Sequence, residues 1–318
     1  MRQIWPATTR CLSTRHSGRF DLSSIRLGVI GLSQGNGHPY SWSAIFNGYD
    51  SVAMEDCGFP SIPRYLEKQQ FPHDTIAEAR VTNVWTQDSN ISAHIAKATY
   101  IETVSNCFTD MIGQVDGVLL ARDDAETHSE FAAPFLKAGI PIYIDKPLAL
   151  TLVEANQLLD MQRYQGQLFS CSALRYAKEF QLSEVERSQI GRIRHIHATV
   201  PKDWDKYAVH AIEPLLLLGG EQGAIIQTQK WKYDDSSVLS VKFSGGLHAL
   251  ICVLGSSNAP IALRVIGESG WKDLFFQDSY YAFKAALFEF VQSIILPGVR
   301  IEKDFMLKVV KLIELGRL

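Results

Sequence analysis

The chain has 318 residues, of which 46% are hydrophobic and 20% charged, and its net charge at pH 7 is -3. This composition is that of a globular protein with a large core, and it gives no general attraction for nucleic acid or anionic membranes. The length is about twice that of a typical domain, so we expect two domains. No apolar run approaches the ~18 residues that a membrane span requires.

The first residues are rich in arginine and contain no acid. Arg2, Arg10, Arg15 and Arg19 lie among serine and threonine, a composition that resembles a transit peptide. An extended or misassigned start explains them equally, so we expect residues 1–24 to be a disordered or mis-started extension. The five cysteines are scattered singly without metal-ligand spacing, which favours buried free thiols in the cytoplasm over a disulfide framework or a zinc site.

The stretch RLGVIGLSQGNGHPYSWSAI has the pattern of a nucleotide-binding strand and turn. An apolar run ends at Gly31, as in a buried parallel strand. A dinucleotide loop would continue as G-x-G-x-x-G, but Ser33 stands in place of the second glycine. Gly35 and Gly37 follow, so we expect a longer loop and a helix that begins near Ser41. By itself, the stretch leaves a phosphate loop and a ligand-free turn equally open.

From Ile25 to Pro147, apolar runs alternate with helical patterns, which predicts a doubly wound parallel sheet. Further strands are expected at 81–86, 115–121 and 140–145. Two capping boxes predict helix starts, and Gly139 with Pro141 predicts a helix end; the boxes pair Thr127 with Glu130 and Thr151 with Glu154. The long segment 48–79 carries several prolines and reads as an inserted surface excursion, a kind of segment that often touches a ligand or partner.

After Gly166 the pattern changes to closely spaced strands joined by polar turns: IRHIHATV, IIQTQKWKY, SVLSVKF, HALICVL and IALRVIG. Such spacing predicts a largely antiparallel sheet. Two helical patterns end the chain, YYAFKAALFEFVQSIIL and FMLKVVKLIELG, and we expect both to pack on this sheet or on the first half.

The segments AGIPIYIDKPLALTLVEANQLL, SALRY, VIGESG and YYAFKAALFEFV carry a likeness to a known family. Through them the chain resembles the Gfo/Idh/MocA family of glucose-fructose oxidoreductases and inositol dehydrogenases, from Ile25 to Arg317. The most specific piece is Asp145-Lys146-Pro147, where the family usually has Glu-Lys-Pro. The resemblance implies a dinucleotide-binding Rossmann domain at 25–148. It also implies an α+β domain on a mainly antiparallel open sheet at 149–318, which binds substrate and forms a homodimer or homotetramer.

The resemblance also implies NAD or NADP as cofactor. The residues expected to bind it are Gly31, Ser33, Gln34, Gly35, Gly37, His38, Ala121, Arg122, Asp123, His128, Asp145, Lys146 and Pro147. A carboxylate after the second strand commonly accepts the ribose hydroxyls. Thr86 falls at this position, and Asp88 follows two residues later as the alternative. We prefer NAD slightly, because no Arg or Lys lies between Trp85 and Ile95 to pair with a 2′-phosphate.

Lys146 is the first candidate for catalysis. Its ammonium could bind the substrate oxygen and stabilise negative charge there, whereas the alternative is an ion pair with Asp145. His210 matches the family histidine of a D-x-x-x-H pattern and could take the alcohol proton. Lys206 replaces the acid of this pattern, and Tyr207 is a lesser catalytic candidate.

Arg175 and Tyr176 fall where a family R-Y pair approaches the substrate, and Trp204 could offer an apolar face to a sugar ring. Together with Lys146 and His210 they form the predicted substrate site, although the R-Y pair could equally anchor a strand to a loop. Arg122 could reach a phosphate or a substrate anion, or only pair with adjacent acids. The residues 195 and 197 are histidines on one strand face, but no carboxylate or cysteine joins them in a motif, so no metal is predicted.

We therefore expect a cytoplasmic NAD(P)-dependent dehydrogenase or reductase. It would transfer a hydride between nicotinamide and a hydroxyl or carbonyl carbon of a sugar, polyol or nucleotide-sugar, without a nucleic acid or membrane partner. One alternative is an NAD-assisted sugar hydrolase or lyase. Another is a catalytically impaired nucleotide-binding sensor or partner protein, which the departures at Ser33, Thr86, Arg122 and Lys206 keep open.

Overall fold

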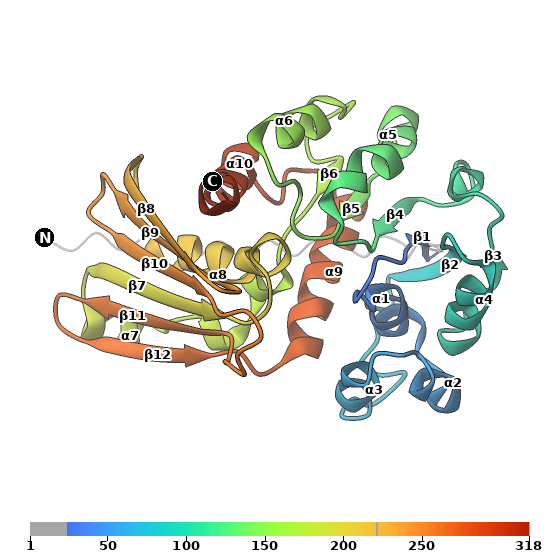
Figure 1. The fold of residues 1–318 in the computed structure, drawn as a ribbon. Coiled ribbons are helices and arrows are strands. Elements are labelled where there is room, and N and C mark those ends of the chain that lie inside the picture. Colours follow the sequence, from blue (N-terminus) through green and yellow to red (C-terminus); the bar gives the residue numbers. More distant parts are fainter. Residues whose placement is uncertain (1–23, 221, 318) are drawn as a thin grey trace, which may run out of the picture.

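The computed structural model of the chain describes residues 24–220 and 222–317 (Figure 1). The predicted extension, with Cys11, lies outside the described residues except for its last position. Within the two described ranges, no helix is long and apolar enough to cross a bilayer. Cys57 and Cys171 are buried free thiols as predicted, whereas Cys107 is exposed and Cys252 is half-buried.

The first sheet confirms the predicted parallel architecture. It has the strand order β3-β2-β1-β4-β5-β6, and every neighbouring pair is parallel. Its strands are β1 (Ile25–Ile30), β2 (Ala79–Trp85), β3 (Thr103–Val104), β4 (Gly117–Leu120), β5 (Ile142–Ile144) and β6 (Leu168–Phe169). The apolar runs are buried because helices cover the sheet: Val29 of β1 and Leu119 of β4 are 0% exposed.

Strand β1 lies between β2 and β4, so the strand order reverses at the loop that follows β1. Open α/β sheets bind ligands at such a point, outside the carboxyl ends of the strands. The segments 31–37, 121–124 and 145–147, which follow β1, β4 and β5, therefore meet at one edge of this sheet.

Helices pack around both sheets (Figure 1). They are α1 (His38–Asn47), α2 (Ser51–Glu55), α3 (Ser61–Leu66), α4 (Ser89–Ala98), α5 (His128–Ala138), α6 (Leu152–Asp160), α7 (Glu184–Ile190), α8 (Trp204–Gly219), α9 (Ser279–Ile295) and α10 (Lys303–Arg317). Short 3₁₀ helices lie at Phe108–Met111, Ala125–Thr127, Ala173–Tyr176 and Lys178–Phe180. In the first half, α1 and α4 pack beside β2, and α5 packs on β4 and β5.

The structure corrects one predicted helix start and one predicted helix cap, although α5 does begin after Thr127 as predicted. Helix α1 begins at His38 rather than near Ser41, because Pro39 takes a first-turn position where its missing N–H costs nothing. The capping box of Thr127 with Glu130 does not form. A 3₁₀ turn precedes α5, and the Thr127 hydroxyl donates to a carbonyl of that turn at 3.0 Å instead.

Other local predictions are confirmed. Thr151 and Glu154 form a reciprocal capping box at the start of α6, and Gly139 ends α5 in the left-handed conformation. The segment 48–79 is more than a surface excursion, since it folds into α2 and α3 and buries Met54 and Ile62.

The second sheet has the order β12-β11-β7-β10-β9-β8 and is antiparallel except between β7 and β10, as the spacing of its strands predicted. The strands are β7 (Ile193–Val200), β8 (Ile225–Tyr233), β9 (Ser236–Phe243), β10 (His248–Val253), β11 (Ala262–Gly267) and β12 (Trp271–Phe275). Strand β12 was not predicted, because an edge strand that buries only Leu274 leaves little periodicity in the sequence.

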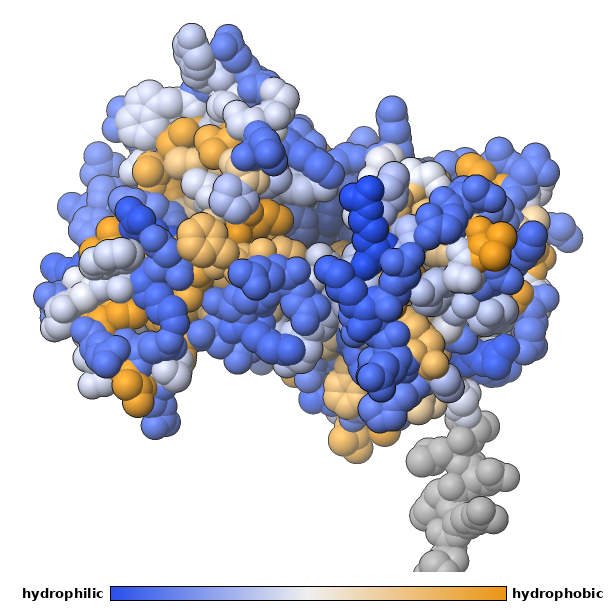
Figure 2. Space-filling model, turned by 90° about the horizontal axis from the view of Figure 1, so that it is seen from below, coloured by the Kyte–Doolittle hydropathy of each residue, from blue (hydrophilic) through white to orange (hydrophobic). Residues whose placement is uncertain are grey.

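Helix α8 covers one face of the second sheet. Among the described residues, the side chains of β7, β9 and β10 on the opposite, open face are exposed or half-buried. Hydrophobic side chains reach the surface of this half, on the left of Figure 2, and Trp271 is 65% exposed. The rings of His195 and His197 lie 6.4 Å apart on β7. In the part of the chain that the structure describes, no group of three or more His, Cys, Asp or Glu side chains could hold a metal ion. Assembly through the open face stays a prediction.

The last two helices connect the halves. Helix α9 buries Leu287 and Phe290 in the core of the first half, although it follows the second sheet in sequence. Helix α10 packs Val310 into that same core and Ile313 into the core of the second half. The chain thus returns to its first half, and a domain boundary at residue 148 stays a prediction.

Candidate active site

The loop after β1 is shaped by its glycines. A Cβ on Gly31 would overlap the ring of Pro39, so glycine is needed there for helix α1 to approach the strand. Gly35 has φ 79° and faces open space, which favours glycine for its backbone alone. Gly37 caps α1 without any side-chain hydrogen bond, and the first turn of α1 contains no acidic residue. The first N–H groups of α1 are already used within the loop, because His38 N–H donates to Asn36 Oδ1 at 2.8 Å. The next two, of residues 40 and 41, donate to the Gly37 carbonyl at 3.0 and 3.2 Å.

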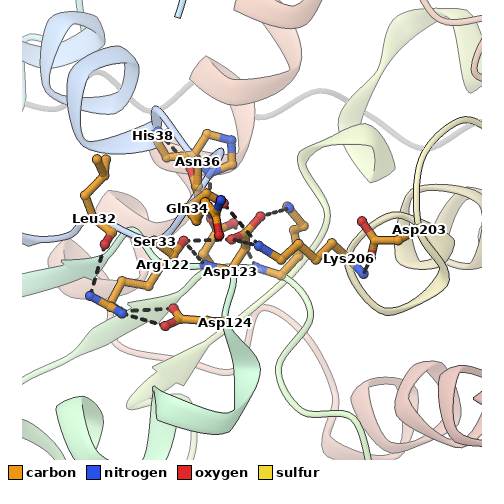
Figure 3. Close-up of polar contacts among 12 residues, drawn as sticks. Leu32, Ser33, Gln34, Asn36, His38, Arg122, Asp123, Asp124, Asp203 and Lys206 are labelled. Carbon is orange, nitrogen blue, oxygen red and sulfur yellow. Dashed lines mark hydrogen bonds and ion pairs between the residues drawn. The ribbon is translucent and has the colours of Figure 1, made fainter. Parts of the chain in front are cut away.

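Ser33, which replaces the second expected glycine, binds the end of β4 (Figure 3). Its hydroxyl lies 2.7 Å from Asp123 Oδ1 and accepts a hydrogen bond from the Asp123 N–H at 3.0 Å. Both residues are buried, with 4% and 6% exposure. The unexpected serine thus links the first loop to the segment after β4.

Two lysines share the Asp123 carboxylate. Lys146, after β5, lies 3.3 Å from Oδ2, and Lys206, on α8, lies 3.0 Å from Oδ1. Burial opposes ionisation of Asp123, but the two ammonium groups and Ser33 outweigh it and lower the pKa of the carboxyl. Lys206 also donates to the Gln34 carbonyl at 3.3 Å, so it connects the second half of the chain to the first loop (Figure 3).

Asp145 binds two residues at the start of α1. Its carboxylate accepts a hydrogen bond from Asn36 Nδ2 at 2.8 Å and lies 2.5 Å from His38 Nδ1. Burial alone would lower the pKa of Lys146, but Asp145 and Asp123 raise it above its usual value. Lys146 is therefore protonated, and the predicted ion pair forms with Asp123 rather than with the adjacent Asp145.

His210 reaches the same region from α8. Burial, and then the charge of Lys146, hold its pKa well below the usual value, so the ring is neutral. Its Nδ1 lies 2.7 Å from Ser172 Oγ, and Ser172 N–H donates to Glu213 at 2.7 Å. Because Ser172 is itself bonded to Glu213, its hydroxyl fixes the orientation of the His210 ring. Burial raises the pKa of Glu213 to about 7, against the opposing effect of Arg175.

Some of these side chains line a cavity of about 260 Å³ between the halves. Its polar wall contains Asp123, Lys146, Lys202, Tyr207 and His210, and its apolar wall contains Phe59, Ile62, Phe276 and Phe283. Loop residues 35–38 also border it. The structure thus brings together the predicted Lys146, Tyr207 and His210.

Several predicted residues lie elsewhere. Arg175 pairs with Glu213 at 3.2 Å and stacks 4.9 Å from the Phe305 ring, and neither it nor Tyr176 lines the cavity. Trp204 is buried, and its indole N–H donates to a carbonyl of α10 at 2.9 Å. All three were expected to contact substrate. They are instead in packed positions, as the anchoring alternative for the R-Y pair predicted.

The residues expected at the adenosine ribose make local contacts. Thr86 donates to the Asp88 carbonyl at 2.6 Å, and Asp88 Oδ1 caps α4 by accepting from Asn90 N–H at 2.8 Å. Gln87, between them, binds both the N–H and the carbonyl of Leu32, at 3.0 and 2.6 Å. Thr86 has no carboxylate, whereas Asp88 is exposed and its Oδ2 has no hydrogen-bond partner among the described residues, so a role of Asp88 at the ribose stays a prediction.

The segment after β4 is held by internal bonds. Arg122 donates from Nε and Nη2 to the two carboxylate oxygens of Asp124, at 3.0 and 2.5 Å. Its Nη1 also donates to the Leu32 carbonyl at 3.3 Å (Figure 3). Pairing with an adjacent acid was one of the two alternatives for Arg122. His128 is fully buried, and its ring nitrogens face the carbonyls of Arg122 and Leu148. Ala121 and Pro147 are buried beside these groups.

Five residues at or beside the cavity had not been predicted: Asn36, Ser172, Lys202, Phe276 and Phe283. The segment 48–79 contributes Phe59 and Ile62 to the apolar wall, in keeping with its expected contact with a ligand. Asn36 had a signal, because it was the unassigned polar residue of the glycine-rich loop. Ser172 begins the SALRY motif, but its contact with His210 joins residues 38 positions apart, which no local pattern reveals.

The loop after β1 lies at the switch point, where such sheets bind dinucleotides, and its Gly35 backbone faces open space. The loop therefore fits a dinucleotide phosphate by its position and its glycines. The geometry does not distinguish NAD from NADP.

Comparison with known proteins agrees with this geometry. A family model described as "Oxidoreductase family, NAD-binding Rossmann fold" (GFO_IDH_MocA) matches residues 25–172. A search of curated proteins found no match.

Solved structures share the fold over almost the whole chain. A myo-inositol 2-dehydrogenase from Lactobacillus plantarum is 16% identical with a TM-score of 0.69, and the match covers 92% of this chain and 96% of that one. GenD2 from gentamicin A biosynthesis, solved in complex with NAD, is 15% identical with a TM-score of 0.67 over 96% of each chain. A UDP-N-acetylglucosamine 3-dehydrogenase from Acidithiobacillus ferrooxidans is 14% identical with a TM-score of 0.67, over 92% and 97%. Residues 25–172, a little under half of the chain, are therefore similar to the Gfo/Idh/MocA oxidoreductase family.

Proposed function

We propose that the protein is an NAD(P)-dependent dehydrogenase or reductase that acts on a hydroxyl or carbonyl carbon of a sugar or polyol. The observation that carries the proposal is the meeting of Lys146 and His210 in one cavity. They come from different halves of the chain, and the cavity lies outside the carboxyl ends of β4 and β5, where such sheets bind ligands.

Lys146 and His210 have the protonation states that the reaction needs. Lys146 is held protonated by Asp123 and Asp145, so it can donate a hydrogen bond to the substrate oxygen and stabilise negative charge there. His210 is held neutral by burial, so it can accept the alcohol proton. Its Nδ1 is bonded to Ser172, which leaves Nε2 for this transfer.

The first loop, from Ser33 to His38, would hold the cofactor phosphates, and the bound nicotinamide would supply the hydride acceptor or donor. A slight preference for NAD rests on the lack of Arg or Lys between Trp85 and Ile95. The cavity volume of about 260 Å³ favours a single sugar or polyol over a nucleotide-linked sugar, because pockets for larger ligands usually hold roughly 300–1,000 Å³.

The test combines cofactor binding with turnover. Melting temperature is measured with NAD, NADH, NADP and NADPH, and NADH or NADPH formation is followed on a panel of sugars and polyols. We expect one cofactor pair to raise the melting temperature and one class of substrate to reduce that cofactor. His210→Asn should lower kcat by roughly 10²- to 10⁴-fold and leave the cofactor Kd unchanged, whereas Lys232→Met, on the exposed strand β8, should change neither.

The alternatives give different results. A cofactor that binds without turnover on the whole panel would favour the impaired sensor, for which the bond of Lys206 to the Gln34 carbonyl across the cleft is the supporting observation. Substrate cleavage without net NADH accumulation would favour the NAD-assisted hydrolase or lyase. Unaltered turnover in His210→Asn would remove this residue from the mechanism.

A further inference from the structure

Lys202 has an unusual backbone and lies at the cavity. It connects β7 to α8 and has φ 67°, in the left-handed region that a lysine rarely adopts. Its N–H donates to the Gly255 carbonyl at 2.7 Å in an isolated bridge, which holds the segment in place. Left-handed backbone at such a residue is unfavourable, and residues in this conformation cluster at functional sites.

The Lys202 side chain points at the polar wall of the cavity. Its ammonium contacts the Tyr207 hydroxyl and lies 4.4 Å from the centre of the Tyr207 ring. Lys146 Nζ lies 5.5 Å from the centre of that same ring. The two ammonium groups are therefore within about 10 Å of each other. A ligand a few bonds long can reach both.

Lys146 and Lys206 each have a carboxylate partner at the cavity, and Lys202 has none among the described residues. Lys146 and Lys206 both pair with Asp123, and Asp145 pairs with His38. Among residues 24–220 and 222–317, no carboxylate lies within ion-pair distance of Lys202. Two lysines share one carboxylate, so a third cation leaves the polar wall with excess positive charge.

We propose that Lys202 binds an anionic group of the substrate, a carboxylate or a phosphate, while Lys146 binds the reacting oxygen. The substrate would then be a sugar acid, a polyol acid or a sugar phosphate rather than a neutral sugar. This inference rests on the proposed function for the role of Lys146, but it concerns binding and needs no turnover. Because Phe59 and Phe283 make their wall of the cavity apolar, the anionic group of the substrate would lie at the wall that carries the lysines.

The experiment measures binding by calorimetry on the full chain, with and without NADH. The ligands are pairs that differ in the anionic group: D-glucose against D-glucuronate and against glucose 6-phosphate, and myo-inositol against myo-inositol 1-phosphate. We expect at least one acidic member to bind more tightly than its neutral partner. Lys202→Met should weaken that binding by about 10- to 100-fold, the effect of losing one charge-assisted hydrogen bond. Lys232→Met removes an exposed charge from β8 and should leave it unchanged.

Each outcome decides the inference. Tight binding of an acidic member that Lys202→Met abolishes supports it, even if no hydride transfer follows, in which case the proposed function alone fails. The glucuronate and phosphate arms tell which anion the site takes. The inference is overturned if no acidic member binds more tightly than its neutral partner, or if Lys202→Met and Lys232→Met bind the acid equally. A melting temperature of Lys202→Met close to that of the parent shows that the variant is folded.

Discussion

The buried His210 makes the stability of the protein depend on pH in a way that can be calculated. In the unfolded chain a histidine titrates near ~6.5, whereas burial and Lys146 hold the pKa of His210 in the folded chain well below this value. As the pH falls through 6.5, the unfolded state therefore takes up a proton that the folded state does not. The contribution of neutral His210 to the free energy of unfolding is therefore fully present well above pH ~6.5 and is lost as the pH falls below it. Between pH 7.5 and 5.5 the loss is about 1.4 kcal/mol.

The variant His210→Asn removes the titrating group and keeps a polar atom near Ser172. The free energy of unfolding is measured by urea denaturation at pH 7.5 and at pH 5.5 for both proteins. We expect the parent to lose about 1.4 kcal/mol more than the variant over this interval. Glu213, whose pKa is about 7, titrates in both proteins, so its effect largely cancels in the difference. Equal losses in the two proteins would refute a neutral, buried His210.

Two glycine substitutions test the packing around the site by thermal unfolding. Gly31→Ala should destabilise the protein by about 1–3 kcal/mol, because the new methyl group would overlap Pro39. Gly298→Ala should shift the melting temperature little, because its methyl group would only contact the Leu296 carbonyl at 3.9 Å. Equal shifts would contradict this packing. Gly316→Ala should destabilise by a similar amount because its methyl group would enter the Trp204 ring, and a wild-type melting temperature would place Trp204 outside the core.

The sequence predicted the fold well where a residue pattern depends on local structure. Buried parallel strands are short apolar runs. A reciprocal cap such as that of Thr151 with Glu154 joins residues only three positions apart. The prediction was wrong for Thr127, because a 3₁₀ turn before α5 offered its hydroxyl a nearer carbonyl. It also missed β12, whose single buried residue, Leu274, produces no alternation.

The site could be predicted only in part, because its contacts join residues that are distant in sequence. Lys146 was found because the strand-end motif around it is local. Arg175 and Trp204 were expected at the substrate, but the pairing of Arg175 with Glu213 and the packing of Trp204 under α10 depend on the tertiary fold. Lys202 had no signal in sequence, since only a bridge to Gly255 gives it its unusual backbone.

Two residues that depart from the family pattern meet at the Asp123 carboxylate. Ser33 and Lys206 depart from the family pattern at positions 173 residues apart, yet both bind the same carboxylate. The hydroxyl of Ser33 and the ammonium of Lys206 thus hold one buried carboxylate from the two halves of the chain. Replacing either residue would change the charge or the hydrogen bonding of a group that the other residue also binds.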